Sequence, residues 1–161
     1  MEQELERYLN DHLAGSSGGL LMIGHLIDTL EDPQAVDFFR QLETDVEEDR
    51  RLLEHLLTTV GLQPSGMLKT AGNLTARVGF LKLMWEGFEP GRLGLLEALE
   101  MLALGVQGKR LLWRALQEIA PAYPEWGKIN FVDLEREAIR QRDGVEAWRV
   151  EAARETFTPA R

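Results

Sequence analysis

Apolar residues recur at helical spacing along nearly the whole chain, and this periodicity constrains the fold more than any other feature. Four stretches carry such an apolar stripe, and they predict helices at about residues 2–30, 33–60, 92–120 and 131–156. No stretch shows the sustained alternation of apolar and polar residues that a half-buried β-strand requires. We therefore expect an all-α protein.

The links between these stretches predict how the helices are connected. Asp32 and Pro33 stand before the second stretch, as N-cap and first helical residue, and Gly61 supplies a stop after it. Because the first link is short, the first two helices are expected to be antiparallel neighbours. About 30 residues separate the second stretch from the third, which is enough to cross the full length of a bundle. An amphipathic segment at about residues 65–85 predicts an additional helix in this crossover.

Two antiparallel hairpins joined by one long crossover are the ferritin-like arrangement of a four-helix bundle, and this is the expected fold. A loop with two prolines and a glycine, at residues 121–130, joins the last two helices. The chain has 161 residues, which suits a single domain with one hydrophobic core, here residues 1–156. Residues 157–161 are expected to form a frayed tail.

Three stretches of the sequence also carry a resemblance: residues 8–30, the run LETDVEED at 42–49 with its continuation to 62, and GVQGKR at 105–110. In these stretches the chain resembles ferritin-like bacterial proteins, especially the small stress-associated group typified by YciE and YciF. Together these stretches make up 50 of the 161 residues. The resemblance implies a helical bundle and a role connected with stress.

The spacing of the histidines argues against the di-iron site that ferritin-like bundles commonly carry. Such a site takes one glutamate from each of two helices and a Glu-x-x-His pair from each of the other two, because residues three apart share a helix face. In this sequence an apolar residue stands three positions before each histidine, in the pairs Leu9 and His12, Met22 and His25, and Leu52 and His55. A standard di-iron site is therefore not expected.

Polar residues on the apolar faces of the predicted helices are the candidate site residues. A projection at about 100° per residue places eight of them in or beside the interior: His12, Ser16, Asp49, Glu100, Lys109, Arg110, Glu137 and Gln141. This set is mixed in charge, whereas a di-iron centre needs several carboxylates and is repelled by a cation among its ligands.

We therefore expect a structural polar layer rather than a metal centre. In this layer Asp49 pairs with one of three partners, His12, Lys109 or Arg110. The side chains of Ser16 and Gln141 would satisfy the remaining hydrogen bonds. Two alternatives stay open, an iron or manganese site and a small-molecule pocket.

Three glycines interrupt the first predicted helix in the run Gly15-Ser16-Ser17-Gly18-Gly19. A glycine inside a helix costs about 1 kcal/mol of stability relative to alanine, so some other feature should compensate. Close approach of another helix is the favoured explanation, and a ligand cradle is the alternative.

Charge and composition narrow the classes of partner and the compartment. The net charge of −9 disfavours binding to nucleic acids and to anionic membrane surfaces. The absence of cysteine excludes disulfides and thiolate chemistry. The N-terminal sequence is acidic, and the longest apolar run, Leu20 to Ile23, is far shorter than the roughly 20 residues of a membrane span. We expect a cytoplasmic protein.

The third predicted helix is apolar around most of its circumference, so it must be covered on more than one face. A homodimer is expected, with Met101, Leu104 and Leu111 as part of a self-complementary patch. The favoured function is that of a non-enzymatic ferritin-like protein in a stress response or in protein interaction. The alternative is an iron- or manganese-dependent oxidoreductase with an atypical ligand set: Asp49, His12, Glu100 and Glu137.

Overall fold

A computed structural model describes residues 2–64 and 91–159 of the chain. In these ranges the protein is all-α and has no strand, as the periodicity predicted. Its elements are α1 (Glu2–Thr29), α2 (Pro33–Thr59), α4 (Arg92–Ile119), the short 3₁₀ helices η1 (Ala120–Ala122) and η2 (Pro124–Trp126), and α5 (Phe131–Phe157). Each long helix ends within one residue of its predicted bounds. The additional helix expected at residues 65–85 falls outside the described residues.

Local hydrogen bonds explain where the helices begin and end. The Asp32 side chain accepts hydrogen bonds from the backbone N–H of Gln34, at 2.7 Å, and of Ala35, at 3.3 Å, and Pro33 is the first residue of α2. Gly61 has a φ of 77°, the left-handed conformation that ends helices and that glycine adopts without strain. The predicted cap and stop of α2 are thus confirmed.

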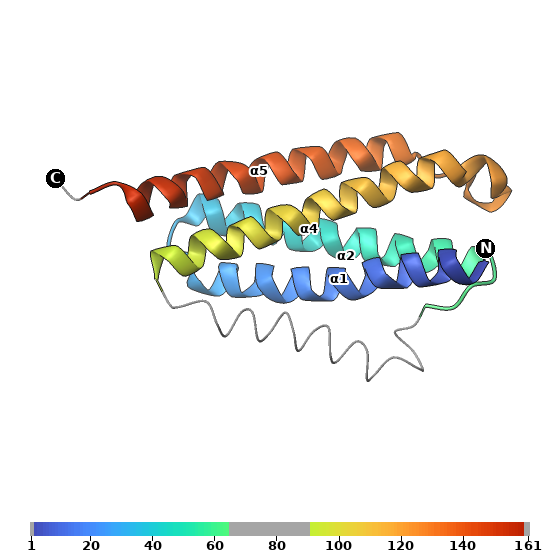
Figure 1. Ribbon diagram of the computed structural model, residues 1–161, viewed down its shortest axis with the longest axis horizontal. Coiled ribbons are helices and arrows are strands. Elements are labelled where there is room, and N and C mark those ends of the chain that lie inside the picture. Colours follow the sequence, from blue (N-terminus) through green and yellow to red (C-terminus); the bar gives the residue numbers. More distant parts are fainter. Residues whose placement is uncertain (1, 65–90, 160–161) are drawn as a thin grey trace.

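The four long helices form a bundle of two antiparallel hairpins (Figure 1). α1 pairs with α2 and α4 pairs with α5, while α1 also packs on α4 and α2 contacts α5 only sparsely. α2 ends and α4 begins at opposite ends of the bundle, so these two helices run in the same direction (Figure 1). The bundle therefore places residues of α1, α2, α4 and α5 around a shared interior.

The hydrophobic core consists of two clusters that follow one another along the bundle. One cluster contains Ile23, Phe39 and Leu99, and the other contains Leu56 and Trp113. On three helices the boundary between the clusters falls at the same level, between Val46 and Leu53 on α2, between Val106 and Leu112 on α4, and between Ala138 and Val145 on α5. Polar candidate residues of all three helices lie at this boundary.

Trp126 ties the loop between α4 and α5 to the bundle. Its side chain is buried, and its indole Nε1 donates a hydrogen bond to the backbone oxygen of Leu56 on α2 at 3.1 Å. Tyr123 stacks on the same indole ring, with 4.3 Å between the ring centroids. The loop thus closes one end of the bundle.

A search of the described helices found none with the length and apolar character needed to cross a membrane.

Candidate functional site

A polar layer joins three helices at the boundary between the two core clusters. Lys109 on α4 donates from Nζ to Oδ2 of Asp49 on α2, at 2.6 Å, and to Oε1 of Gln141 on α5. Of the three partners expected for Asp49, the structure therefore shows Lys109. The amide oxygen of Gln141 is also used as an acceptor, as the sequence led us to expect.

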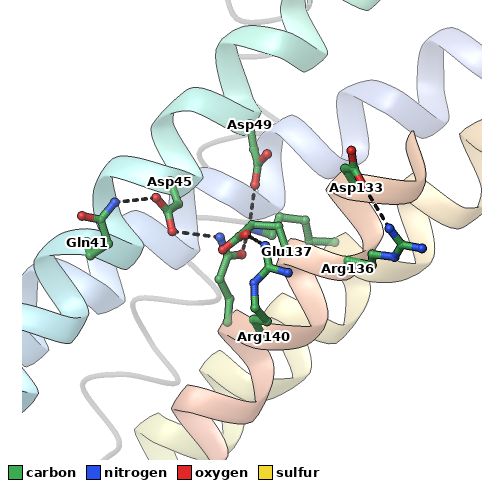
Figure 2. Close-up of polar contacts among 9 residues, drawn as sticks. Gln41, Asp45, Asp49, Asp133, Arg136, Glu137 and Arg140 are labelled. Atoms are coloured by element: carbon green, nitrogen blue, oxygen red, sulfur yellow. Dashed lines mark hydrogen bonds and ion pairs between the residues drawn. The ribbon is translucent and has the colours of Figure 1, made fainter. Parts of the chain in front are cut away.

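The layer continues from Gln141 along α2. Nε2 of Gln141 donates to Oδ2 of Asp45 at 2.9 Å, and Nε2 of Gln41 donates to the other oxygen of Asp45 at 2.7 Å (Figure 2). The amide of Gln141 thus accepts from a cation on one side and donates to a carboxylate on the other. This chain of hydrogen bonds connects α4, α5 and α2.

The charges in the layer are largely withdrawn from water. The side chains of Lys109 and Asp49 are 12% and 17% exposed, and Gln141 is 5% exposed. Burial raises the pKa of Asp49, and the neighbouring carboxylates of Asp45 and Glu137 raise it further, while Lys109 opposes the shift. The lysine ammonium is therefore the group that keeps a negative charge tolerable at this position.

A second polar contact, between α1 and α2, involves a residue that the sequence analysis did not select. Nη1 of Arg50 donates to the backbone oxygen of Leu13 at 3.0 Å, to Oγ of Ser16 at 2.9 Å and to Oγ of Ser17 at 2.6 Å. Arg50 lies four residues after Val46, so it shares the inward face of α2. The spacing from Val46 could therefore have identified Arg50 as an inward residue. Ser16 bonds to Arg50 and does not take part in the Asp49 layer.

His12 makes no described hydrogen bond to the polar layer and does not pair with Asp49. Its ring meets Tyr8 edge-on, with 4.8 Å between the ring centroids. Burial lowers the pKa of His12, although the carboxylate of Asp11 opposes the shift. His12 is therefore mainly uncharged at neutral pH.

Of the remaining candidates, Glu100 is exposed, which corrects its expected place in the interior, whereas Arg110 and Glu137 are half-buried beside it. Glu100 is exposed and accepts from Arg149 at 3.3 Å, Arg110 pairs with Glu135 at 3.0 Å, and Glu137 pairs with Arg140. The reason is that α4 and α5 pack closely along their length, so charged groups beside the contact pair with one another in reach of water.

The carboxylates and histidines do not assemble into a metal site in the part of the chain that the structure describes. Within residues 2–64 and 91–159, no three His, Asp or Glu side chains come together as a set that could hold a metal ion. Of the four residues considered for an atypical site, Asp49 binds Lys109, His12 contacts Tyr8, and Glu100 and Glu137 each pair with an arginine.

A cavity of about 160 Å³ lies beside the polar layer, between α1, α2 and α4. Gly15 and Gly19 of α1 and Gly105 of α4 contribute to its wall. No described atom lies within 4 Å of a Cβ added at Gly15 or Gly19. The expected close approach of another helix at these two glycines is therefore not found among the described residues.

Comparison of the chain with family models, with curated proteins and with solved structures gave no match.

Proposed function

We propose that this protein is a non-enzymatic, ferritin-like bundle whose interior ion pair takes the place of a metal centre. It would act by association with other molecules, in a cytoplasmic role connected with stress, rather than by redox chemistry. The single observation that carries the proposal is the ammonium of Lys109, 2.6 Å from Asp49 and buried among α2, α4 and α5.

The physical argument is one of charge. Asp49, Asp45 and Glu137 interact electrostatically near this point, and such a group of carboxylates would otherwise attract a cation. Lys109 supplies that cation covalently, as part of α4. A metal ion of charge +2 or +3 would meet the ammonium at short range in a poorly hydrated interior, where repulsion between like charges is strong.

The order of the helices supports the ferritin-like class. Ferritin-like bundles have two antiparallel hairpins and one long crossover, so that the second and third bundle helices run in the same direction. α2 and α4 have that relation (Figure 1). Within the described residues no three His, Asp or Glu side chains form a set that could hold a metal ion, which speaks against the alternative, an iron- or manganese-dependent oxidoreductase.

Metal analysis of the full-length protein tests the proposal. Protein purified without chelator should contain less than about 0.1 equivalent of iron or manganese, and anaerobic Fe(II) titration followed by air should cause no oxygen consumption above buffer. The matched variant Lys109→Met removes the ammonium and should bind Fe(II) more tightly than the wild type. Stoichiometric metal in the wild type, with oxygen consumption, would establish the oxidoreductase instead.

The association proposed here includes a homodimer. Leu104 and Leu111 project from the outer side of α4 and are 66% and 53% exposed, and Met101 is partly buried beside the core. Large exposed leucines that recur on one helix favour a protein contact over open solvent. A twofold contact through this face would cover both leucines.

A further inference from the structure

The residues that line the cavity between α1, α2 and α4 distinguish it from an ordinary packing defect. Helical glycines on two different helices, Gly15 and Gly19 on α1 and Gly105 on α4, all border it. No described atom lies within 4 Å of a Cβ added at any of the three. A larger side chain at any of these glycines would therefore occupy the space without displacing a described atom.

Most of the remaining wall is apolar. Ile23, Val46 and Leu102 line one part of the cavity, and Leu53 and Trp113 line another. A volume of about 160 Å³ suits one aromatic ring, because an apolar protein cavity of about 150 Å³ binds benzene. Trp113 offers an aromatic surface against which a ring can pack.

The charged groups of the wall balance one another. The lining residues include two carboxylates, Asp11 and Asp49, and two cations, Arg50 and Lys109, so the cavity has no excess charge with which to hold an ion. Asp49 and Lys109 neutralise each other directly at 2.6 Å, and Nη1 of Arg50 is already bonded to oxygen atoms of α1. An uncharged occupant therefore fits this wall better than an anion or a cation.

Among the residues of the wall, one buried polar atom has no hydrogen-bond partner in the described part of the chain, and the half-buried His12 makes no described hydrogen bond. Nε1 of Trp113 is buried without an acceptor, although the residue is only 1% exposed. The imidazole of His12, uncharged because burial lowers its pKa, makes a ring contact with Tyr8 but no described hydrogen bond. Buried polar groups are nearly always hydrogen-bonded, so the unpaired Nε1 of Trp113 beside the cavity points to an acceptor supplied by a ligand.

We propose that this cavity is a binding site for a small uncharged aromatic molecule with one hydroxyl group, of which phenol is the simplest representative. The ring occupies the space between the glycines of α1 and α4, and the hydroxyl exchanges a hydrogen bond with His12. This site does not depend on the proposed function, because it uses the space beside the Asp49–Lys109 pair and not the pair itself.

Calorimetric titration of the full chain with phenol, and with benzene as the probe without a hydroxyl, tests this inference. The wild type should bind phenol saturably with one site per chain, and benzene more weakly by about threefold or more. In ¹H–¹⁵N spectra phenol should shift the indole N–H signal of Trp113 and leave that of Trp148, a residue outside the cavity, unchanged. Absence of saturable phenol binding to the wild type would overturn the proposal.

Two matched variants locate the binding. Gly105→Leu fills the cavity, whereas Gly108→Leu adds the same side chain to the same helix outside the cavity wall. Both should remain folded, and only Gly105→Leu should lose phenol affinity, by at least tenfold. Equal affinity of the two variants would show that phenol binds elsewhere.

The variant His12→Leu tests the polar contact. It should weaken phenol binding several-fold and leave benzene binding unchanged. An equal loss for both probes, or no loss for phenol, would refute the assignment of His12.

Discussion

The contact between Asp49 and Lys109 restricts the conformation of the protein more than it adds to its stability. Removing two charges from water costs several kcal/mol for each ion, and their attraction returns roughly that amount, so a buried pair adds little net stability. The pair does restrict how the helices pack, because Lys109 reaches Asp49 and Gln141 together only in one register of α2, α4 and α5. We therefore regard the layer as a device that fixes helix register.

Truncation of Asp49 is expected to be severe. Asp49→Ala leaves the largely buried ammonium of Lys109 without a counterion, and should reduce the free energy of unfolding by about 3–5 kcal/mol. Urea denaturation followed by circular dichroism measures the loss. The double variant Asp49→Leu/Lys109→Met should recover much of it, because the desolvation of both charges disappears together.

The same variants distinguish the ion pair from a metal site. If Asp49 were a metal ligand, EDTA would lower the melting temperature of the wild type, and Asp49→Ala would melt at an unchanged or higher temperature regardless of EDTA. We expect the opposite, an EDTA-independent wild type and a clearly destabilised variant. A loss below about 1 kcal/mol for Asp49→Ala would contradict the ion-pair interpretation.

His12 is expected to make stability depend on pH below neutrality. Its pKa in the folded protein is lower than the ordinary value of 6.5, so the unfolded chain takes up a proton first as the pH falls. Stability is then lost on acidification through pH 6.5, until the pH reaches the folded-state pKa. Urea denaturation at pH 7.5 and at pH 5.5 should show a smaller loss in His12→Gln than in the wild type.

The control for this titration is His55→Gln, since His55 is exposed on α2. This variant should retain the pH dependence of the wild type. The titration of Asp49 affects stability in the opposite direction and in a different pH range. Because the pKa of Asp49 is raised in the folded protein, its contribution to stability falls as the pH rises from below 3.8 through the folded-state pKa. A His12→Gln protein with the full wild-type loss between pH 7.5 and 5.5 would disprove the assignment.

At the scale of the helices, local sequence was enough to predict the elements but not all of their inward faces. Apolar spacing and cap residues such as Asp32 act within a few positions, so the helix bounds followed from them. Asp49 and Gln141 were predicted to face inward because each lies within the apolar stripe of its helix, and that stripe determines which side of the helix is buried. Glu100 could not be placed, because α4 is apolar around most of its surface and only the packing of α5 decides which side is covered.

The contacts of the glycines depended even more on tertiary structure. The sequence drew attention to Gly15 and Gly19, yet the close approach occurs at Gly144 of α5, where a Cβ would lie 2.5 Å from Cζ of Phe38 on α2. No residue near Gly144 in the sequence indicates its contact with Phe38, because Phe38 is distant in the sequence. The cavity and the Arg50 contact were hidden for the same reason, since both require the relative positions of α1 and α2.

Substitution of Gly144 tests this helix contact. Gly144→Ala gains up to about 1 kcal/mol of helix propensity, but the methyl group would overlap the Phe38 ring, and overpacking costs about 1–3 kcal/mol. We expect a net decrease in the free energy of unfolding. Gly108→Ala, where no described atom lies within 4 Å of the new Cβ, should instead be neutral or stabilising.

A second substitution identifies the ring as the cause. In a Phe38→Leu background, Gly144→Ala should no longer destabilise the protein, because the ring that it would overlap is absent. Destabilisation of the same size in both backgrounds would mean that Phe38 is not responsible.

At the scale of the whole molecule, the exposed leucines of α4 predict self-association. The charged variant Leu104→Glu/Leu111→Glu should sediment as a monomer at concentrations where the wild type is a dimer, because a carboxylate in a twofold contact meets its own copy. The control is Leu21→Glu, a leucine that is 62% exposed on a different helix, α1. A monomeric wild type at high micromolar concentration would refute the dimer.

The uneven packing between the helices has a consequence for the order in which the chain folds. Contacts are dense within the hairpins α1–α2 and α4–α5 and sparse between α2 and α5, where Gln141 and Asp45 share a hydrogen bond. Interactions local in sequence form fastest, so each hairpin should act as a cooperative folding unit that docks later onto the other. In native-state hydrogen exchange, the amides within each hairpin should therefore lose protection together, and those of the two hairpins separately.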